Sequence, residues 1–212
     1  MRTVIQIILT IAIVILGYMV FESIMKPIRF NKDKDKREDA TIDRLIDIRE
    51  AQKAYKDLHL EYTDNFDTLA DFLENDSFEI IKAIGTIPED LIDSVGSVKK
   101  ARDIALERGI IKREVTKIPV KDSLFSDDYP IDSLRYVPYT SGLTFDMEAD
   151  EYETSSSLVI QVLEVSVLYD DLLKGLDPQL SVNYASEREK ITNFPGLKFG
   201  SLTEGTLSGN WE

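Results

Sequence analysis

The chain has 212 residues and a formal net charge of −14, with 43% hydrophobic and 30% charged residues. This composition is typical of a folded protein and excludes a largely disordered chain. Residues 38–212 carry 18 basic and 36 acidic side chains, which disfavours nucleic acid as a partner, because phosphate binding depends on lysine and arginine. The lack of cysteine excludes disulfides, thiolate catalysis and thiolate metal ligands.

An N-terminal apolar run organises the rest of the chain. From Val4 to Phe21 the sequence is VIQIILTIAIVILGYMVF, with Gln6 and Thr10 as its clearly polar residues. About 18 residues at about 1.5 Å each approach the roughly 30 Å hydrocarbon layer of a bilayer. The sequence therefore predicts a transmembrane anchor, 1–27, that ends or kinks at Pro27, because proline lacks an amide hydrogen.

A cleavable signal peptide is the main alternative for this run. Arg2 supplies the short basic start of such a peptide. Signal peptides, however, have a shorter apolar core followed by a small-x-small cleavage site, and no Ala-x-Ala pattern follows the run. We therefore expect a retained, single-pass anchor in the inner (cytoplasmic) membrane.

The charges around the span point in two directions. Six basic residues lie between 26 and 37, against Arg2 and the α-amino group before the span, and the positive-inside rule would then keep the domain in the cytoplasm. Against this, a short basic tip before the span is typical of an uncleaved signal-anchor, and acidic residues alternate with the later lysines. We predict a periplasmic domain, and a cytoplasmic one stays open.

A charged neck, 28–40, and a helical stalk region, 41–76, are predicted after the anchor. The neck contains NKDKDKRED from Asn31 to Asp39, whose alternating charges are typical of a solvated juxtamembrane segment. Between 41 and 59 apolar residues recur at three- and four-residue spacing, which predicts an amphipathic helix. A second short helix is expected to carry the apolar residues Phe66, Leu69, Phe72 and Leu73.

The remaining residues, 77–212, are predicted to form an α+β domain rich in strands. We expect strands at 78–84, 110–120, 133–139, 143–147, 158–168 and 197–202, and a helix at 97–108. Ser141-Gly142 is predicted as a hairpin turn. The expected fold class is α+β, with an N-terminal transmembrane helix, an amphipathic helical stalk and a strand-rich C-terminal domain.

Leu45–Tyr55 contains the pattern A-x-x-A-Y and is followed by Tyr62 and Phe66–Leu69. In these residues the stalk resembles the first helix of type IV pilin-like proteins and pseudopilins. Those proteins carry a prepilin peptidase site, a glycine before Phe-Thr-Leu-Ile-Glu, which this chain lacks. The chain more closely resembles uncharacterised single-pass envelope proteins of Bacteroidota, in this helix and in the endings Phe194–Leu202 and Gly209–Glu212. That resemblance implies an envelope protein and transfers no activity.

No residue pattern predicts an enzyme, a cofactor or a metal. His59 is the only histidine, and at the end of the predicted stalk helix a structural role is the simpler interpretation than a catalytic triad. Asp146, Glu148 and Asp150 have the spacing of the first calcium-loop ligands, but the turn glycine and the closing glutamate are missing. We therefore predict no catalytic, cofactor-binding or metal-binding residues.

Three residues are candidate partner contacts. Gln6 and Thr10 lie four residues apart, on one side of the predicted span, and polar side chains in lipid often hydrogen-bond to a neighbouring helix. The alternative for Gln6 is that it reaches toward the bilayer surface. Trp211 belongs either to the core of its own domain, which is the favoured interpretation, or to an interface as an exposed aromatic.

From the anchor, the stalk and the missing catalytic pattern we hypothesise a non-enzymatic structural or assembly subunit of a bacterial envelope complex. Such a complex would serve secretion, a pilus-like apparatus or energised transport. The expected partners are other membrane proteins and the lipid bilayer. The alternative is a membrane-tethered module that binds a protein client or ligand through the strand-rich half.

Overall fold

The computed structural model describes residues 2–212, so Met1, the first residue of the predicted anchor, lies outside the described residues. At a few positions it describes the backbone without the side chain, namely Val4, Ile81–Ala83 and Arg113. The side chains of the predicted strand 78–84 are therefore described only in part.

The chain forms two compact units. We call Met1–Phe66 together with Asp132–Glu212 the anchor unit, and Asp67–Ile131 the insert unit, because the second interrupts the sequence of the first. Both units combine helices with antiparallel strands. The predicted α+β fold class is thus confirmed.

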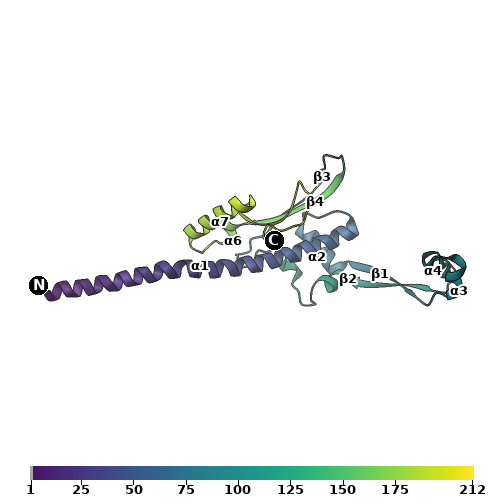
Figure 1. Cartoon of the computed structure of the whole chain (residues 1–212), viewed down its shortest axis with the longest axis horizontal. Coiled ribbons are helices and arrows are strands. Elements are labelled where there is room, and N and C mark those ends of the chain that lie inside the picture. Colours follow the sequence, from purple (N-terminus) through teal and green to yellow (C-terminus); the bar gives the residue numbers. More distant parts are fainter. Residues whose placement is uncertain (1) are drawn as a thin grey trace. The chain divides into compact units, whose positions relative to one another are not determined.

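The anchor unit is built on one long helix, α1, Arg2–His59, which runs as a single rod in Figure 1. The prediction that the helix ends at Pro27 is wrong, because Pro27 lies inside α1. The alternative, a kink at Pro27, stays a prediction. Proline removes one hydrogen bond to the preceding turn, whereas each helical residue on either side adds one. The predicted anchor, the predicted neck and the first part of the predicted stalk region, up to His59, are therefore parts of one helix. Its end at His59 confirms the predicted end of the amphipathic helix, 41–59.

The second half of α1 packs on an antiparallel sheet of order β3-β4-β5. The strands are β3, Asp146–Glu153, β4, Val159–Leu168, and β5, Gly196–Ser201. The buried face of the sheet and the buried face of α1 consist of apolar side chains, among them Leu163, Val165, Val167, Leu197, Phe199, Leu45, Ile48, Ala51 and Tyr55. Burial of each large apolar side chain contributes about 1.5–3 kcal/mol, which holds the sheet on the helix.

Two strands of this sheet, predicted at 158–168 and 197–202, are confirmed as β4 and β5. The predicted strand 143–147 overlaps β3 only at its end. Five of the eight residues of β3 are Asp or Glu, which are depleted in strands. Pairing with β4 along the whole length of β3 overrides that local preference.

The predicted strand 133–139 is wrong. Ile131–Ser133 forms a 3-10 turn, η1, and the residues after it contribute one bridge, between Tyr136 and Thr144. The chain reverses direction between Tyr136 and Thr144. The predicted turn at Ser141-Gly142 lies in this segment. Gly142 has a φ of +83°, a left-handed conformation that glycine adopts without a steric penalty.

Two helices between β4 and β5 were not predicted. They are α6, Tyr169–Leu172, and α7, Pro178–Thr192, and both lie along α1 in Figure 1. Asp177 caps α7, because its carboxylate accepts the N–H of Leu180 at 3.0 Å. Pro178 occupies the first turn, where a missing N–H costs nothing.

The insert unit contains an antiparallel pair of strands, β1, Ser77–Ile84, and β2, Lys112–Pro119. Its helices are α2, Phe66–Asn75, α3, Glu89–Val95, α4, Val98–Glu107, and α5, Val120–Leu124. The strands predicted at 78–84 and 110–120 and the helices predicted after Tyr62 and at 97–108 are confirmed. The short helices α3 and α5 were not predicted.

A buried glutamine joins the end of α1 to the loop after it. Gln52 has 0% of its surface exposed. Its Nε2 donates to the carbonyl of Thr63 at 2.6 Å, and its Oε1 accepts the N–H of Thr63 at 3.2 Å. Since buried backbone groups need partners, this pair of hydrogen bonds fixes the loop against the helix.

We expect Gln52→Leu to lower the free energy of unfolding of the full chain by about 1–3 kcal/mol, because Thr63 then keeps unpaired backbone groups in the interior. Lys53→Ala is the matched control, since the ion pair of Lys53 with Glu50 is 46% exposed on both sides, and its loss costs less than about 0.5 kcal/mol. Denaturant unfolding in detergent, followed by circular dichroism, measures both. Equal losses would contradict the role of Gln52.

Candidate functional site

The first feature of the candidate site is the apolar surface of α1 from Ile5 to Phe21. Large side chains there are more than half exposed, from 54% at Ile15 to 67% at Val14. The most apolar window has a mean hydropathy of 2.4, and none of it is buried. A surface of this kind marks contact with lipid or with another protein. The segment is consistent with a single membrane span or a signal sequence, and it belongs to the one helix among residues 2–212 with the length and composition to cross a membrane.

Gln6 and Thr10 lie one turn apart on this surface. The hydroxyl of Thr10 donates to the backbone carbonyl of Gln6 at 2.9 Å, so its hydrogen stays within the helix. Both side chains line a shallow hollow of about 270 Å³ together with Thr3, Ile7 and Ile11. The side-chain amide of Gln6 makes no hydrogen bond within the described chain, and its contact with a partner stays a prediction.

Just beyond the apolar segment, an ion pair attaches α1 to the start of α7. Nζ of Lys26 lies 2.7 Å from Oδ2 of Asp177. The Lys26 ammonium holds the pKa of the Asp177 carboxyl below its usual value, and the N–H of Leu180 acts in the same direction. The Asp177 carboxylate therefore both caps α7 and forms an ion pair with Lys26 of α1.

Arg37 attaches α1 to the end of α6. Its Nη1 donates to the carbonyl of Leu172 at 2.8 Å and to the carbonyl of Lys174 at 3.0 Å. The last carbonyls of a helix have no partner within the helix. Arg37 therefore satisfies groups that the short helix α6 leaves open.

The prediction of a solvated neck, 28–40, is wrong for the face of α1 that meets α6 and α7. Phe30 is 7% exposed, and the Lys34 and Glu38 side chains are 12% and 13% exposed. Alternating charges had favoured a solvated segment, but α7 supplies partners for this face. The neck is thus part of the packed structure.

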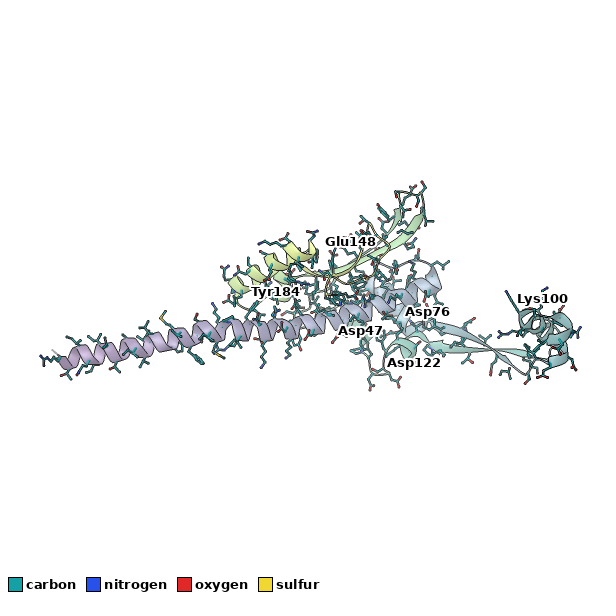
Figure 2. The ribbon with its side chains drawn as sticks, viewed as in Figure 1. Asp47, Asp76, Lys100, Asp122, Glu148 and Tyr184 are labelled. Atoms are coloured by element: carbon teal, nitrogen blue, oxygen red, sulfur yellow. The ribbon has the colours of Figure 1, made fainter. Side chains whose placement is uncertain are left out.

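Four side chains form what we call the neck cluster: Lys34, Glu38, Tyr169 and Tyr184. The hydroxyl of Tyr184 donates to Oε1 of Glu38 at 2.8 Å, and Nζ of Lys34 lies 3.2 Å from Oε2 of Glu38. The Lys34 ammonium also lies 4.2 Å from the ring centroid of Tyr184, whose ring meets that of Tyr169 edge-on at 5.0 Å. Figure 2 shows Tyr184 on the side of α7 that faces α1. The cluster joins three helices, because Lys34 and Glu38 lie on α1, Tyr169 on α6 and Tyr184 on α7.

Burial raises the pKa of both tyrosine hydroxyls in the neck cluster, and the nearby Glu38 carboxylate raises each pKa further, since a phenolate beside it would be repelled. Burial alone would lower the pKa of Lys34, but its ion pairs with Asp35 and Glu38 outweigh this and raise the pKa. At neutral pH the lysine is therefore charged and the tyrosines are neutral.

The C-terminal segment closes the outer edge of β5 through Asn210. Its backbone N–H donates to the carbonyl of Lys198 at 2.9 Å, and its Nδ2 donates to the carbonyl of Gly196 at 2.9 Å. Its Oδ1 accepts the N–H of Lys198 at 3.1 Å. The backbone and side chain of this one residue thus take the place of a further strand at this edge.

Trp211 is half-buried and packs against the chain's own backbone. A Cβ atom at Gly209 would lie 2.5 Å from ring atoms of Trp211, so only glycine leaves room for the ring. The ring therefore serves packing within the anchor unit. A contact of Trp211 with a partner stays a prediction.

The residues considered for chemistry lie on the surface. The ring of His59 is exposed and stacks on Tyr55 at a centroid distance of 4.3 Å. Asp146, Glu148 and Asp150 are exposed along one side of β3, because alternate residues of a strand share a face. Within the described part of the chain, no group of three or more His, Asp or Glu residues is placed to hold a metal ion.

A polar hollow of about 360 Å³ lies in the anchor unit. The turn Tyr139–Leu143 lines it together with Asp171 and Lys174. The Lys36 ammonium lies 5.0 Å from the ring centroid of Tyr139, whose φ of +61° is uncommon for a bulky residue. Hydroxyls, an aromatic ring and both signs of charge suit this hollow to a polar ligand.

Comparisons with protein families, with curated proteins and with solved structures find no match to this chain. The resemblance to pilin-like proteins and to Bacteroidota envelope proteins therefore stays a prediction.

Sequence reasoning missed the neck cluster and the closure by Asn210. One signal was present: Asp177-Pro178 is a typical start of a helix, and that helix brings Tyr184 to α1. A lysine and a glutamate four residues apart, such as Lys34 and Glu38, also occur on solvated helices. Lys34 and Glu38 can be recognised as part of a buried cluster only from their contacts with Tyr184 on α7.

We expect Tyr169 and Tyr184 to ionise only at a pH above the ordinary pKa of 10.0. Because both pKa values are raised by folding, their contribution to stability is complete below pH 10.0 and is lost as the pH rises through the folded-state pKa values. Tyrosinate absorbance during an alkaline titration should show a late phase that disappears in Tyr169→Phe/Tyr184→Phe. Tyr136→Phe, at a tyrosine that is 45% exposed, is the matched control and should leave the late phase of Tyr169 and Tyr184 in place. A late phase that persists in the double variant would count against the cluster.

Proposed function

We propose that the protein is a membrane-anchored, non-enzymatic structural or assembly subunit of a bacterial envelope complex, serving secretion, a pilus-like apparatus or energised transport. The observation that carries the proposal is the continuity of α1. Its exposed apolar segment runs without interruption into the helix that forms the core of the anchor unit.

The continuity of α1 favours a retained anchor over a cleaved signal. Phe21 ends the apolar run, and Lys26, five residues later, already binds Asp177. Five helical residues advance about 7.5 Å, so the folded unit begins directly at the end of the apolar segment. A cleavage there would have to cut a helix beside these contacts.

In this proposal the apolar side chains contact lipid, and Gln6 contacts another membrane protein. An amide in hydrocarbon without a partner is costly. Thr10 uses its own donor within the helix, which leaves the Gln6 amide to bond to a neighbouring span. Other membrane proteins and the bilayer are thus the proposed partners.

We place the folded units in the periplasm, with the anchor in the inner membrane. The positive-inside rule opposes this through the cations after the span. Three of those cations, however, serve the folded unit: Lys26 binds Asp177, Lys34 binds Glu38, and Arg37 binds the end of α6. This structural role gives a reason for basic residues at these positions other than retention in the cytoplasm.

A membrane-tethered binding module is the second candidate function, favoured by the polar hollow beside Tyr139. Exchange of residues 2–25 for an unrelated single span separates the two functions. A binding module should keep full function on the new anchor, because its site lies in the folded unit. An assembly subunit that depends on Gln6 should lose association with its complex. Retained association after the exchange would favour the binding module.

We expect Gln6→Leu to reduce recovery of the partner membrane protein from mild detergent by about 3- to 30-fold, because hydrogen bonds between membrane helices contribute about 0.6–2 kcal/mol. Ile8→Leu exchanges one exposed apolar side chain for another and should leave the recovery unchanged. Cross-linking in membranes with quantitative mass spectrometry measures both. A wild-type protein that purifies only as a monomer with no associated protein, or equal losses in the two variants, would contradict the proposal.

A further inference from the structure

The sheet of the anchor unit ends in an open edge at β3. β3 pairs with β4 on one side, and no strand in the described chain pairs with its other side. The N–H of Glu151 donates to Oδ1 of Asp150 at 2.7 Å instead of to a strand. At the opposite end of the sheet, Asn210 closes β5. An open edge strand presents N–H and C=O groups to which a strand of another chain can pair.

The edge of β3 is strongly acidic and is not neutralised by its own sheet. Its sequence, DMEADEYE, contains five carboxylates and no cation. None of the residues opposite these carboxylates on β4 is a cation: they are Ser166, Glu164, Val162, Gln161 and Val159. Lys198 on β5 is already paired with Glu164 at 2.8 Å. Like charges that face each other are unfavourable, so the β3 edges of two copies would repel each other.

The complementary edge lies on β2 of the insert unit. Its sequence, KREVTKIP, contains three basic residues and one acidic residue. β1 and β2 form a two-stranded sheet, and among the residues described no third strand pairs with β2. Lys112 lies opposite Ile84, and the ion pair of Lys117 with Glu79 is 3.4 Å long and 68% and 56% exposed. An ion pair this exposed is weak, so both lysines remain available.

We propose that β2 of one copy pairs antiparallel with the edge of β3 in a second copy. Lys112 and Lys117 are five residues apart, as are Asp146 and Glu151. An antiparallel pairing with Lys117 opposite Asp146 places Lys112 opposite Glu151. No like charges then face each other, since the other opposed pairs are Thr116 with Met147, Val115 with Glu148, Glu114 with Ala149, and Arg113 with Asp150.

This contact joins two different surfaces, so each copy offers β2 to one neighbour and β3 to another. Such head-to-tail contacts generate either closed rings or open rows. The inference deepens the proposed assembly function and rests on it for one point: anchors in a shared membrane keep the copies side by side. The strand pairing itself does not need the contact at Gln6.

Cysteine cross-linking tests the pairing without background, because the chain has no cysteine. Full-length Val115→Cys and Glu148→Cys chains with different tags are mixed in detergent micelles and oxidised. We expect the mixed disulfide dimer in about tenfold excess over a control mixture in which Ile80→Cys, on β1, replaces Val115→Cys. Equal yields from the two mixtures, or no mixed dimer, would overturn the proposal.

Charge reversal tests why the two edges recognise each other. Lys112→Glu/Lys117→Glu in the Val115→Cys chain should reduce the mixed dimer about tenfold, and Asp146→Lys/Glu151→Lys in the Glu148→Cys chain should restore it. About 1 M salt should weaken the contact of the unreversed pair without any change of sequence. At this concentration the Debye length is about 3 Å, so exposed charges farther apart than this are largely screened from each other. No effect of either reversal or salt would overturn the proposal.

Adding Gln6→Leu to both chains keeps the two proposals distinguishable. The mixed dimer should persist if the strands pair, and its loss would overturn the pairing. Loss of the partner membrane protein with the mixed dimer intact supports both proposals. Retention of that partner in Gln6→Leu counts against the proposed function alone.

Discussion

The hydrogen-bond ladder of α1 is the constraint on which the rest of the anchor unit depends. In hydrocarbon every backbone N–H and C=O must find its partner within the segment, and a helix provides this. The same ladder continues through Pro27 to His59. The side chains of this one helix change along its length, from exposed apolar residues up to Phe21 to a face that is buried from Phe30 onward.

The neck shows how buried charges fix the rotation of α1 about its own axis. Removing Lys34 and Glu38 from water is unfavourable unless each finds partners. Glu38 has the Lys34 ammonium and the Tyr184 hydroxyl, while Arg37 satisfies the carbonyls at the end of α6. Only one rotation of α1 about its axis brings these groups to α6 and α7. Polar contacts therefore determine which face of α1 meets the folded unit, and apolar burial holds it there.

Sequence patterns predicted those elements whose signal is local. The three- and four-residue spacing of the stalk predicted the buried face at Leu45, Ile48 and Tyr55, and apolar runs predicted β4 and β5. The structure places Gln6 and Thr10 on the side of the helix that their spacing indicates. β3 could not be recognised, because its carboxylates oppose strand formation and its pairing with β4 decides the outcome. Tyr184 and Glu38 of the neck cluster are 146 residues apart in the sequence, a distance at which no local pattern relates them.

Membranes of different thickness change the angle at which a span crosses them, since a helix longer than the hydrocarbon layer tilts to fit. In this protein no flexible joint separates the span from the folded unit: α1 is continuous, and Lys26 and Arg37 fasten α7 and the end of α6 to it. In the proposed membrane-anchored protein, a tilt of the span would therefore incline the anchor unit by the same angle against the membrane plane. The thickness of the membrane would then set the direction in which the acidic edge of β3 faces.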